Sequence, residues 1–269
     1  MLEARWTAGR RRLTAAAAGV VGNHYRENYD VHHLDPELPL AVIADGMGDG
    51  PGSAFAGRTA VDRFARSQRE ATQAQAPAAL RATVAKIQEE VRLSGRDLPG
   101  LVGCTLTALV ADEAEGAWIV QLGDSRAYRL RDGLLELLTV DHTAAWLGLL
   151  HAWFAADSPD ARAARYELTR YIGHPDAPEP DVLNVSLRPA DVYLLCTDGV
   201  ADQLTYDQIR DALSGEPPVG PLRDAASRPG GRSVRDGTPR AAVRVLLDAT
   251  LAAGGADNAT AVVIRVLPD

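Results

Sequence analysis

The sequence contains few of the residues that crosslink a small fold or hold a structural zinc ion. Its only two cysteines, Cys104 and Cys196, lie in apolar, strand-like runs. Their separation matches neither a zinc knuckle nor a redox pair, so we expect both to be buried packing thiols. A disulfide framework is therefore excluded, and the sequence favours a reducing, cytoplasmic location.

Long hydrophobic runs are also missing. No segment reaches the roughly twenty consecutive apolar residues that a helix needs to cross a bilayer. The apolar stretch 13–21 is too short for a secretory signal and has no clear cleavage site, although it follows Arg10, Arg11 and Arg12. We therefore expect no membrane association.

The sequence has fewer basic than acidic residues, with 28 Lys and Arg residues and 36 Asp and Glu residues, which gives a net charge of -8. This balance repels a nucleic-acid backbone on average, so we expect no nucleic-acid partner. The glycine-rich segment 46–52 matches neither a dinucleotide fingerprint nor a P-loop. With 46% hydrophobic residues, the composition is that of a globular protein that can bury a substantial core.

The first part of the chain predicts two strands followed by two helices. The apolar runs 13–22 and 38–45 indicate strands on either side of a polar loop, in which His32 and His33 are expected to be solvated. We expect Ser53 to cap the first helix. That helix would present four residues to a core: Phe55, Ala56, Ala60 and Phe64. The second helix has its apolar residues along one face, spaced four, three and four: Leu80, Val84, Ile87 and Val91.

The rest of the chain is richer in short strands. Four are expected in succession, at 104–112, 117–124, 126–133 and 134–141, followed by helical composition over 144–172. A strand, two helices and a last strand are expected at 192–199, 205–213, 241–253 and 258–266. The Pro, Gly and Arg-rich segment 215–239 indicates a mobile surface loop. Without an internal repeat or clear linker, residues 1–269 are expected to form one domain of strands with helices packed outside.

The informative pattern is that apolar strands repeatedly end at aspartate beside glycine. It occurs at Asp45-Gly46, Gly123-Asp124 and Asp198-Gly199, and a fourth aspartate, in Asp257-Asn258, stands immediately before the last expected strand. One such pair is usually only a turn, and scattered turn aspartates are the alternative interpretation. If the strand ends converge, however, the carboxylates cannot all stay ionised without a cation among them.

The donor types indicate which cation would fit. Carboxylate, carbonyl and water oxygens are preferred by Mg²⁺ and Mn²⁺, whereas zinc would recruit the histidines or cysteines that lie outside these clusters. Lacking a side chain, Gly46 could let its carbonyl approach a metal ion. Two divalent ions bridged by a carboxylate can activate a water for attack on a phosphoryl group, which suggests phosphate-ester hydrolysis.

Taken in order, the segments RENYD, VIADGMGDG, GCTLTALV, QLGDSRAYRLRDG, LLTVDHT, LLCTDGVAD and ADNATAVVI resemble the motifs of the metal-dependent protein phosphatase family, also called protein phosphatase 2C, in its bacterial form. The resemblance runs from about residue 13 to the C-terminus. It implies an α+β fold, in which a central sandwich of two antiparallel sheets has helices on both outer faces and a metal centre at one end. The implied activity is metal-dependent hydrolysis of phosphoserine and phosphothreonine on proteins, with serine/threonine kinases among the partners.

The resemblance also implies roles for individual residues. Asp45 would bridge two Mn²⁺ or Mg²⁺ ions, the Gly46 carbonyl would bind the second ion, and Asp198 and Asp257 would hold the first. Asp30 would order a metal-bound water, and Asp124 would help Asp198 to bind a third, weaker ion. Arg26 is the candidate for gripping substrate phosphate as a bidentate donor. The segment 144–172 corresponds to the variable flap beside the cleft.

Three departures from the family pattern bear on activity. Tyr29 stands where an acidic or amide residue is usual, so either it packs over the cleft edge or a water contact to the second ion is missing. Arg26 lies four residues before Asp30 rather than five. Asp49 adds a carboxylate that could repel an anionic substrate or contact a metal.

Competing interpretations remain open. The departures motivate a catalytically weak phosphatase-like sensor or phosphopeptide-binding module, and a metal pair could also serve a phosphatase that acts on small molecules. Ser125 lacks the context of a nucleophile elbow and is expected to be a turn hydroxyl. His142 is expected to be a hydrogen-bonded structural residue rather than a general acid.

Overall fold

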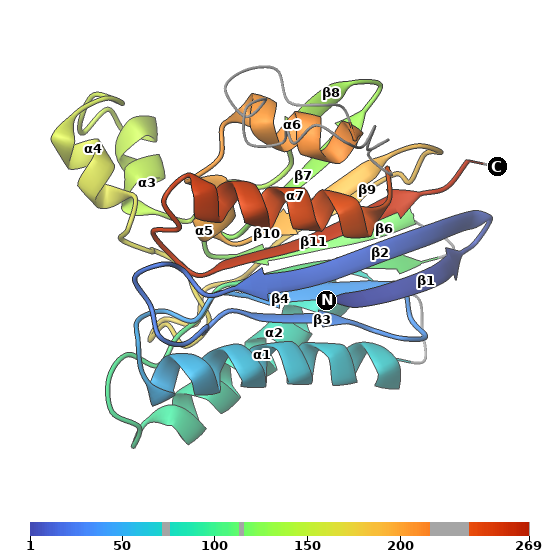
Figure 1. The fold of residues 1–269 in the computed structure, drawn as a ribbon. Coiled ribbons are helices and arrows are strands. Elements are labelled where there is room, and N and C mark those ends of the chain that lie inside the picture. Colours follow the sequence, from blue (N-terminus) through green and yellow to red (C-terminus); the bar gives the residue numbers. More distant parts are fainter. Residues whose placement is uncertain (72–75, 113–115, 216–236, 269) are drawn as a thin grey trace.

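The computed structural model describes residues 1–71, 76–112, 116–215 and 237–268, which form two stacked antiparallel sheets (Figure 1). Sheet A has six strands in the spatial order β1-β2-β11-β10-β7-β8, and sheet B has five in the order β3-β4-β5-β6-β9. The strands of sheet A are β1 (Leu2–Ala8), β2 (Arg11–Val20), β7 (Arg126–Arg131), β8 (Leu134–Leu137), β10 (Val192–Cys196) and β11 (Ala259–Val266). Those of sheet B are β3 (Val31–Leu34), β4 (Leu40–Ala44), β5 (Leu106–Asp112), β6 (Gly116–Leu122) and β9 (Asp181–Val185).

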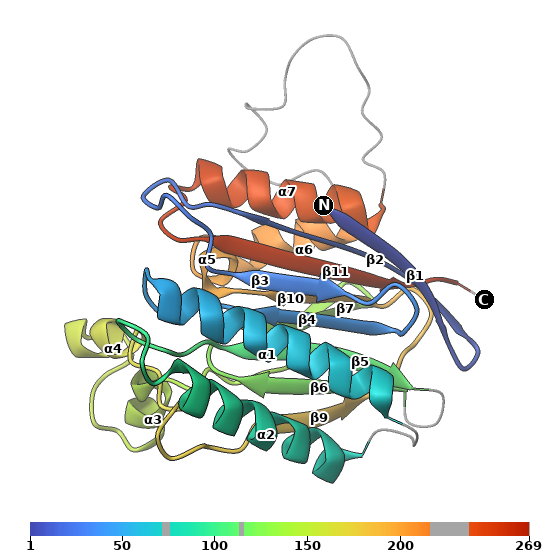
Figure 2. The same ribbon diagram turned by 90° about the horizontal axis from the view of Figure 1, so that it is seen from below.

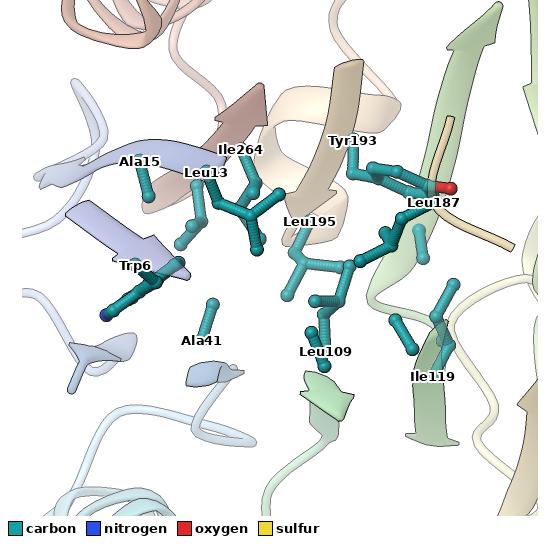
Figure 3. Close-up of a cluster of buried hydrophobic side chains, with 14 of the residues drawn as sticks. Trp6, Leu13, Ala15, Ala41, Leu109, Ile119, Leu187, Tyr193, Leu195 and Ile264 are labelled. Atoms are coloured by element: carbon teal, nitrogen blue, oxygen red, sulfur yellow. The ribbon is translucent and has the colours of Figure 1, made fainter. Parts of the chain in front are cut away.

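The facing surfaces of the two sheets form one apolar layer (Figure 3). Leu13, Tyr193 and Ile264 enter it from sheet A, and Leu109 and Ile119 enter it from sheet B; all five are buried. The Tyr193 hydroxyl donates a hydrogen bond to the Ser186 carbonyl at 3.0 Å, so the polar end of this side chain is satisfied. Burial of this layer is the main stabilising contribution to the stacking of the sheets.

Helices cover both outer faces of the sandwich (Figure 2). Two pack on sheet B, α1 (Pro51–Glu70) and α2 (Pro77–Gly95), and three pack on sheet A, α5 (Asp198–Ala201), α6 (Tyr206–Ser214) and α7 (Pro239–Ala252). The two remaining short helices, α3 (Ala144–Leu150) and α4 (Pro159–Ala164), lie together at one end of the sandwich in both views. The expected α+β sandwich with helices on both outer faces is confirmed.

The predicted core faces of the first two helices are largely confirmed. The four residues of α2 are all buried: Leu80, Val84, Ile87 and Val91. In α1, Ala56, Ala60 and Phe64 are buried, whereas Phe55 is only partly so.

The expected cap at Ser53 is wrong. The helix α1 begins at Pro51 with Gly50 as the N-cap, because proline has no N–H to satisfy and fits the first turn. The Ser53 hydroxyl instead donates a hydrogen bond to the Met47 carbonyl.

Three strands were absent from the sequence prediction, and all three lie at sheet edges: β1, β3 and β9. The strand expected to be first is β2, and it forms a hairpin with β1 through a turn in which Gly9 has φ 56°. The strand β3 contains His32 and His33, so the expected solvated loop is wrong at these two half-buried residues. The strand β1, LEARWTA, does alternate apolar and polar residues, whereas β3 and β9 are runs of four and five residues without clear alternation.

The remaining expectations meet mixed outcomes. The segment 144–172 contains α3 and α4 but is mostly non-helical between and after them.

Of the expected mobile loop 215–239, residues 216–236 lie outside the described residues. Cys104 and Cys196 are free and buried, as expected. Within the described ranges, no helix combines the length and apolar character needed to span a membrane.

Candidate active site

Aspartates gather in a cleft of about 290 Å³ at the end of the sandwich where α3 and α4 lie. Asp45, Asp124, Asp198 and Asp257 all line it. The other lining residues are Tyr25, Gly46, Met47, Gly48, Leu101, Thr105, Tyr166, Leu168 and Asn258. Convergence of the four aspartates at one cleft is thus observed.

Strand order explains how residues distant in sequence meet here. Asp198 follows β10 and Asp257 precedes β11, and these strands are antiparallel neighbours, with Cys196 opposite Ala261. The close approach of the two segments requires Gly199, because a Cβ there would lie 1.9 Å from the Asn258 carbonyl oxygen. The other two aspartates reach the same end from sheet B, since Asp45 follows β4 and Asp124 follows β6.

Asp45 and Asp198 form the centre of the cleft. Burial raises the pKa of both carboxyls, well above the usual range for Asp45 and to about 6 for Asp198. Repulsion from the negative charges of Asp30 and Asp198 also raises the pKa of Asp45. Carboxyls that repel one another in this way are stabilised in their ionised form by a bound cation, so the pair favours a positively charged ligand.

Asp30 lies buried beneath this pair. The Thr197 hydroxyl donates a hydrogen bond to Asp30 Oδ2 at 2.9 Å, and the Asp30 backbone N–H is bonded to Asn28 Oδ1 at 2.9 Å. Burial raises the pKa of Asp30 to about 7, although the Thr197 hydrogen bond opposes the change. The structure therefore brings Asp30 against Asp45 and Asp198 without placing it on the cleft surface.

The carboxyls of Asp124 and Asp257 also line the cleft and have raised pKa values. Burial raises the pKa of Asp124 well above its usual range, and repulsion from Asp198 adds to this. Burial also raises the pKa of Asp257, against a 2.7 Å hydrogen bond that the Asn258 backbone N–H donates to its Oδ1. The Tyr25 hydroxyl is hydrogen-bonded to Asp257, and the negative charge of Asp257 raises the pKa of that phenol.

The donor set fits hard divalent cations. Asp198 Oδ1 is buried and has no hydrogen-bond partner within the described part of the chain, so it is an orphaned acceptor at the floor of an acidic cleft. The other cleft donors are carboxylate, hydroxyl and carbonyl oxygens, which Mg²⁺ and Mn²⁺ prefer. No three His, Cys, Asp or Glu side chains of the described residues form a complete preassembled ligand cluster.

The turn that carries Asp45 and Gly46 is fixed by the neighbouring strand. Thr105 Oγ1 accepts a hydrogen bond from the Asp45 backbone N–H at 2.9 Å, and the Thr105 N–H donates to the Asp45 carbonyl at 2.8 Å. A Cβ on Gly46 would lie 2.8 Å from the Tyr29 carbonyl oxygen and 3.1 Å from its Cβ. Glycine is therefore required at 46 by packing against Tyr29, a reason that the sequence did not reveal.

The structure does not bring Arg26 to the cleft. This residue is exposed in the loop before β3 and is not among the residues that line the cavity. Asp49 is likewise exposed. Tyr29 is half-buried against Gly46, which agrees with the packing interpretation.

Two polar residues outside the aspartates have structural roles. The His142 ring is buried; its Nδ1 accepts a hydrogen bond from the Gly123 N–H at 3.1 Å, and its Nε2 lies 3.1 Å from Asp181 Oδ2. Ser125 is fully buried, and its Oγ lies 2.7 Å from Thr105 Oγ1. The expectation that neither is a nucleophile or general acid agrees with these contacts.

Sequence reasoning missed several residues of the site. Asn258 Oδ1 accepts from the Gly22 N–H at 3.1 Å and its Nδ2 donates to the Glu27 carbonyl at 3.1 Å, so it ties the loop that carries Tyr25 to the segment that carries Asp257. Thr197 and Asn258 each stand directly beside one of the predicted site aspartates, in the runs Thr-Asp-Gly and Asp-Asn. This adjacency could have identified them from the sequence. Nothing in the local sequence singled out Tyr25.

Comparisons with known proteins agree on one family. The model of the family described as Protein phosphatase 2C matches residues 25–225. The serine/threonine phosphatase stp of Listeria monocytogenes is 26% identical over 205 residues, which cover 74% of this chain and 81% of that protein. The structure of PppA of Pseudomonas aeruginosa, described as a key regulatory component of T6SS, has a TM-score of 0.75 and 31% identity and covers 95% of this chain and 98% of its own. The catalytic domain of the serine/threonine protein phosphatase PstP, solved with two manganese ions, has a TM-score of 0.71 and 27% identity over 95% of this chain and 99% of that one.

Proposed function

Because this chain belongs to the protein phosphatase 2C family, we propose that it hydrolyses phosphoserine and phosphothreonine on other proteins with the help of bound manganese or magnesium ions. The observation that carries the proposal is the acidic cleft with the orphaned Asp198 Oδ1 at its floor. Serine/threonine kinases that carry such phosphates are among the proposed partners.

We assign the proposed roles as follows. Asp45 and the Gly46 carbonyl would hold a pair of ions together with Asp198 and Asp257, and Asp124 would contribute to a third, weaker site. A bound ion pair would supply positive charge that activates a water and neutralises the phosphoryl oxygens. Asp30 would orient water near Asp45 as a buried acceptor whose position is fixed by the Thr197 hydroxyl.

Turnover of p-nitrophenyl phosphate tests this proposal. We expect release of p-nitrophenol that depends on manganese, and a loss of at least about 10³-fold in Asp198→Ala, because removal of a metal ligand removes most of the charge stabilisation. Asp97→Ala is the matched control, since Asp97 is an exposed aspartate of the loop after α2. Folded wild-type protein that stays inert across manganese concentrations would contradict the proposal.

A second function is favoured by one observation. Among the described residues that line the cleft there is no Arg or Lys to grip a phosphate, since Arg26 lies outside the lining. Without such a residue, the protein could bind phosphopeptides and hydrolyse them only slowly, which would make it a phosphopeptide-binding sensor. Calorimetry that detects phosphopeptide binding without phosphate release would favour the sensor, whereas steady turnover of the same peptide would eliminate it.

A further inference from the structure

A polar cavity of about 590 Å³ lies beside the first turn of α7. Its basic side chains are Arg5 of β1, Arg240 of α7 and Arg265 of β11, and we call this cavity the arginine pocket. Arg265 follows Asp257 by eight residues, which span about 25 Å in an extended strand. The arginine pocket therefore lies at the end of the sandwich opposite the acidic cleft, where the C-terminus is marked (Figure 1).

The register of sheet A places two of these arginines in one row. Thr14 of β2 lies opposite Arg5 on one side and opposite Arg265 on the other. The residues next to them along each strand belong to the inner apolar layer, so all three side chains lie on the outer face of the sheet. The apolar part of that face, which α7 covers, ends at the row of Ala16 and Val263. Two arginines, about 10 Å apart across two strand spacings, therefore occupy the first row beyond this cover.

The guanidinium of Arg265 has no negatively charged partner. Its Nη2 donates a hydrogen bond to the Leu213 carbonyl at 2.9 Å, whereas its Nε is buried and has no hydrogen-bond partner in the described part of the chain. Burial lowers the pKa of Arg265, and no carboxylate of the described residues forms an ion pair with it. A partly buried charge without a counter-charge is costly, so an anion bound beside this guanidinium would stabilise it.

The rest of the lining adds positive charge. Arg5 is exposed and forms no ion pair within the described ranges, whereas Arg240 pairs with Glu3, the acidic residue of the lining. The helix α7 begins here with Thr238 as its N-cap and Pro239 in its first turn, so the positive end of the helix dipole faces the cavity. Three arginines, one glutamate and a helix N-terminus thus form an electropositive site on a protein whose net charge is -8.

Phosphate fits this combination of donors. Arginine binds phosphate through paired N–H donors, and the first turn of a helix favours negative charge. The cavity falls within the range of about 300–1,000 Å³ that is typical of small-molecule sites. It therefore has room for an organic group beside the phosphate, against Ala15 and Leu267. We propose that the arginine pocket binds a small organic phosphate, with the phosphate group between Arg5 and Arg265.

Calorimetry in EDTA tests the proposal, because EDTA removes ions that would bind phosphate at the acidic cleft. The probes are AMP and glucose 6-phosphate, with adenosine and glucose as their uncharged counterparts and inorganic phosphate as the bare anion. The variants are Arg5→Gln and Arg265→Gln. Arg92→Gln is the matched control, since it removes the same charge from an exposed position in the last turn of α2.

We expect wild type to bind at least one of the two organic phosphates about tenfold or more tightly than its uncharged counterpart. Each pocket variant should weaken that binding by about tenfold, the scale of one charge-assisted hydrogen bond, and Arg92→Gln should change it by less than about twofold. Because Arg265 also holds the Leu213 carbonyl, the exposed Arg5 provides a test that does not depend on folding. No binding of either phosphate by wild type, unchanged affinity in Arg5→Gln, or equal weakening by Arg92→Gln would overturn the proposal.

Two comparisons identify the source of the phosphate. Inorganic phosphate that binds as tightly as both organic phosphates would mean an adventitious ion only and would overturn the proposal. A phosphoserine peptide that binds more tightly than AMP and glucose 6-phosphate would assign the pocket to a segment of another protein and overturn the small-molecule ligand. Binding in EDTA requires no turnover, so a failure of the phosphatase function would leave the result at the arginine pocket unaffected.

Discussion

At the residue scale, burial sets the behaviour of the acidic cleft. Asp30 shows this most simply, because it lies below the surface and has the Thr197 hydroxyl as its hydrogen-bond donor. A carboxyl whose pKa is raised to about 7 in the folded state binds its proton more tightly there than in the unfolded chain. Its contribution to stability is therefore complete below about pH 4 and is lost as the pH rises through about 7.

We predict that metal-free wild type loses stability relative to Asp30→Asn between pH 4 and pH 7, by about 2–4 kcal/mol. Asparagine can still accept the Thr197 hydrogen bond but carries no charge at any of these pH values. Urea unfolding of both proteins in EDTA at several pH values measures the difference. If the difference in unfolding free energy between the two proteins stays constant from pH 4 to pH 7, burial does not raise the pKa of Asp30.

Gly46 supplies a second prediction at this scale. Its missing side chain lets the turn after β4 pack against the Tyr29 carbonyl, only 2.8 Å from where a Cβ would sit. We expect Gly46→Ala to cost about 1–3 kcal/mol in unfolding free energy through overpacking and to lower manganese-dependent turnover. Gly237→Ala is the control, because nothing lies within 4 Å of a Cβ there. Equal stability of the two variants in urea unfolding would contradict this account.

Individual residues also show where reading the sequence succeeds and fails. Asp45, Asp198 and Asp257 were found because an aspartate at the boundary of an apolar strand leaves a local pattern, and the order of such patterns matched a known family. Tyr25 and Asn258 were missed because their roles depend on a loop and a strand that meet only after folding, which no local pattern records. Arg26 was expected at the phosphate from its position along the chain, yet it is exposed and outside the cleft lining.

At the scale of elements, His142 connects three pieces of the structure. Its Nδ1 and backbone N–H bond to Gly123 in the turn that carries Asp124, and its carbonyl accepts from the Thr169 N–H at the end of the flap at 2.8 Å. Its Nε2 reaches Asp181 at the start of β9. Burial lowers the pKa of His142, which favours the neutral ring that can accept at Nδ1.

We predict that His142→Ala lowers the unfolding free energy by about 2–3 kcal/mol, because it leaves buried donors unpaired and opens a cavity. It should also raise the manganese concentration needed for half-maximal turnover, since the turn before Asp124 is loosened. His142→Asn should lose less, because its Oδ1 can accept the Gly123 N–H in place of Nδ1. Equal losses in the two variants would mean that packing alone explains the role of the ring.

Helices and strands also differ in how easily they can be predicted from the sequence. The helix α2 was read correctly because four apolar residues at helical spacing are all buried on one side. The edge strands β3 and β9 were missed because runs of only four and five residues, such as the one with His32 and His33, do not alternate clearly. The edge strand β1 does alternate apolar and polar residues, so its signal was present in the sequence and was overlooked.

At the scale of the whole molecule, bound metal should decide how stable the fold is. The net charge of -8 and the buried carboxyls around Asp45 both oppose folding of the metal-free chain near neutral pH. We predict that manganese at about 100 times its dissociation constant adds about 2.7 kcal/mol to the unfolding free energy per site. Urea unfolding with manganese or EDTA measures this, and the gain should be absent in Asp198→Ala. An unchanged midpoint in the wild type would remove the metal site from its proposed position.

The position of β11 in sheet A has a kinetic consequence. This strand is the last that the structure describes, yet it lies between β2 and β10 in the middle of the sheet, with Asp257 immediately before it. During synthesis on a ribosome, the edge of β2 that pairs with β11 stays unpaired until about 240 later residues have been made. A product arrested before β11 would have neither a closed sheet nor Asp257, so the cleft is completed only when synthesis of this strand is complete.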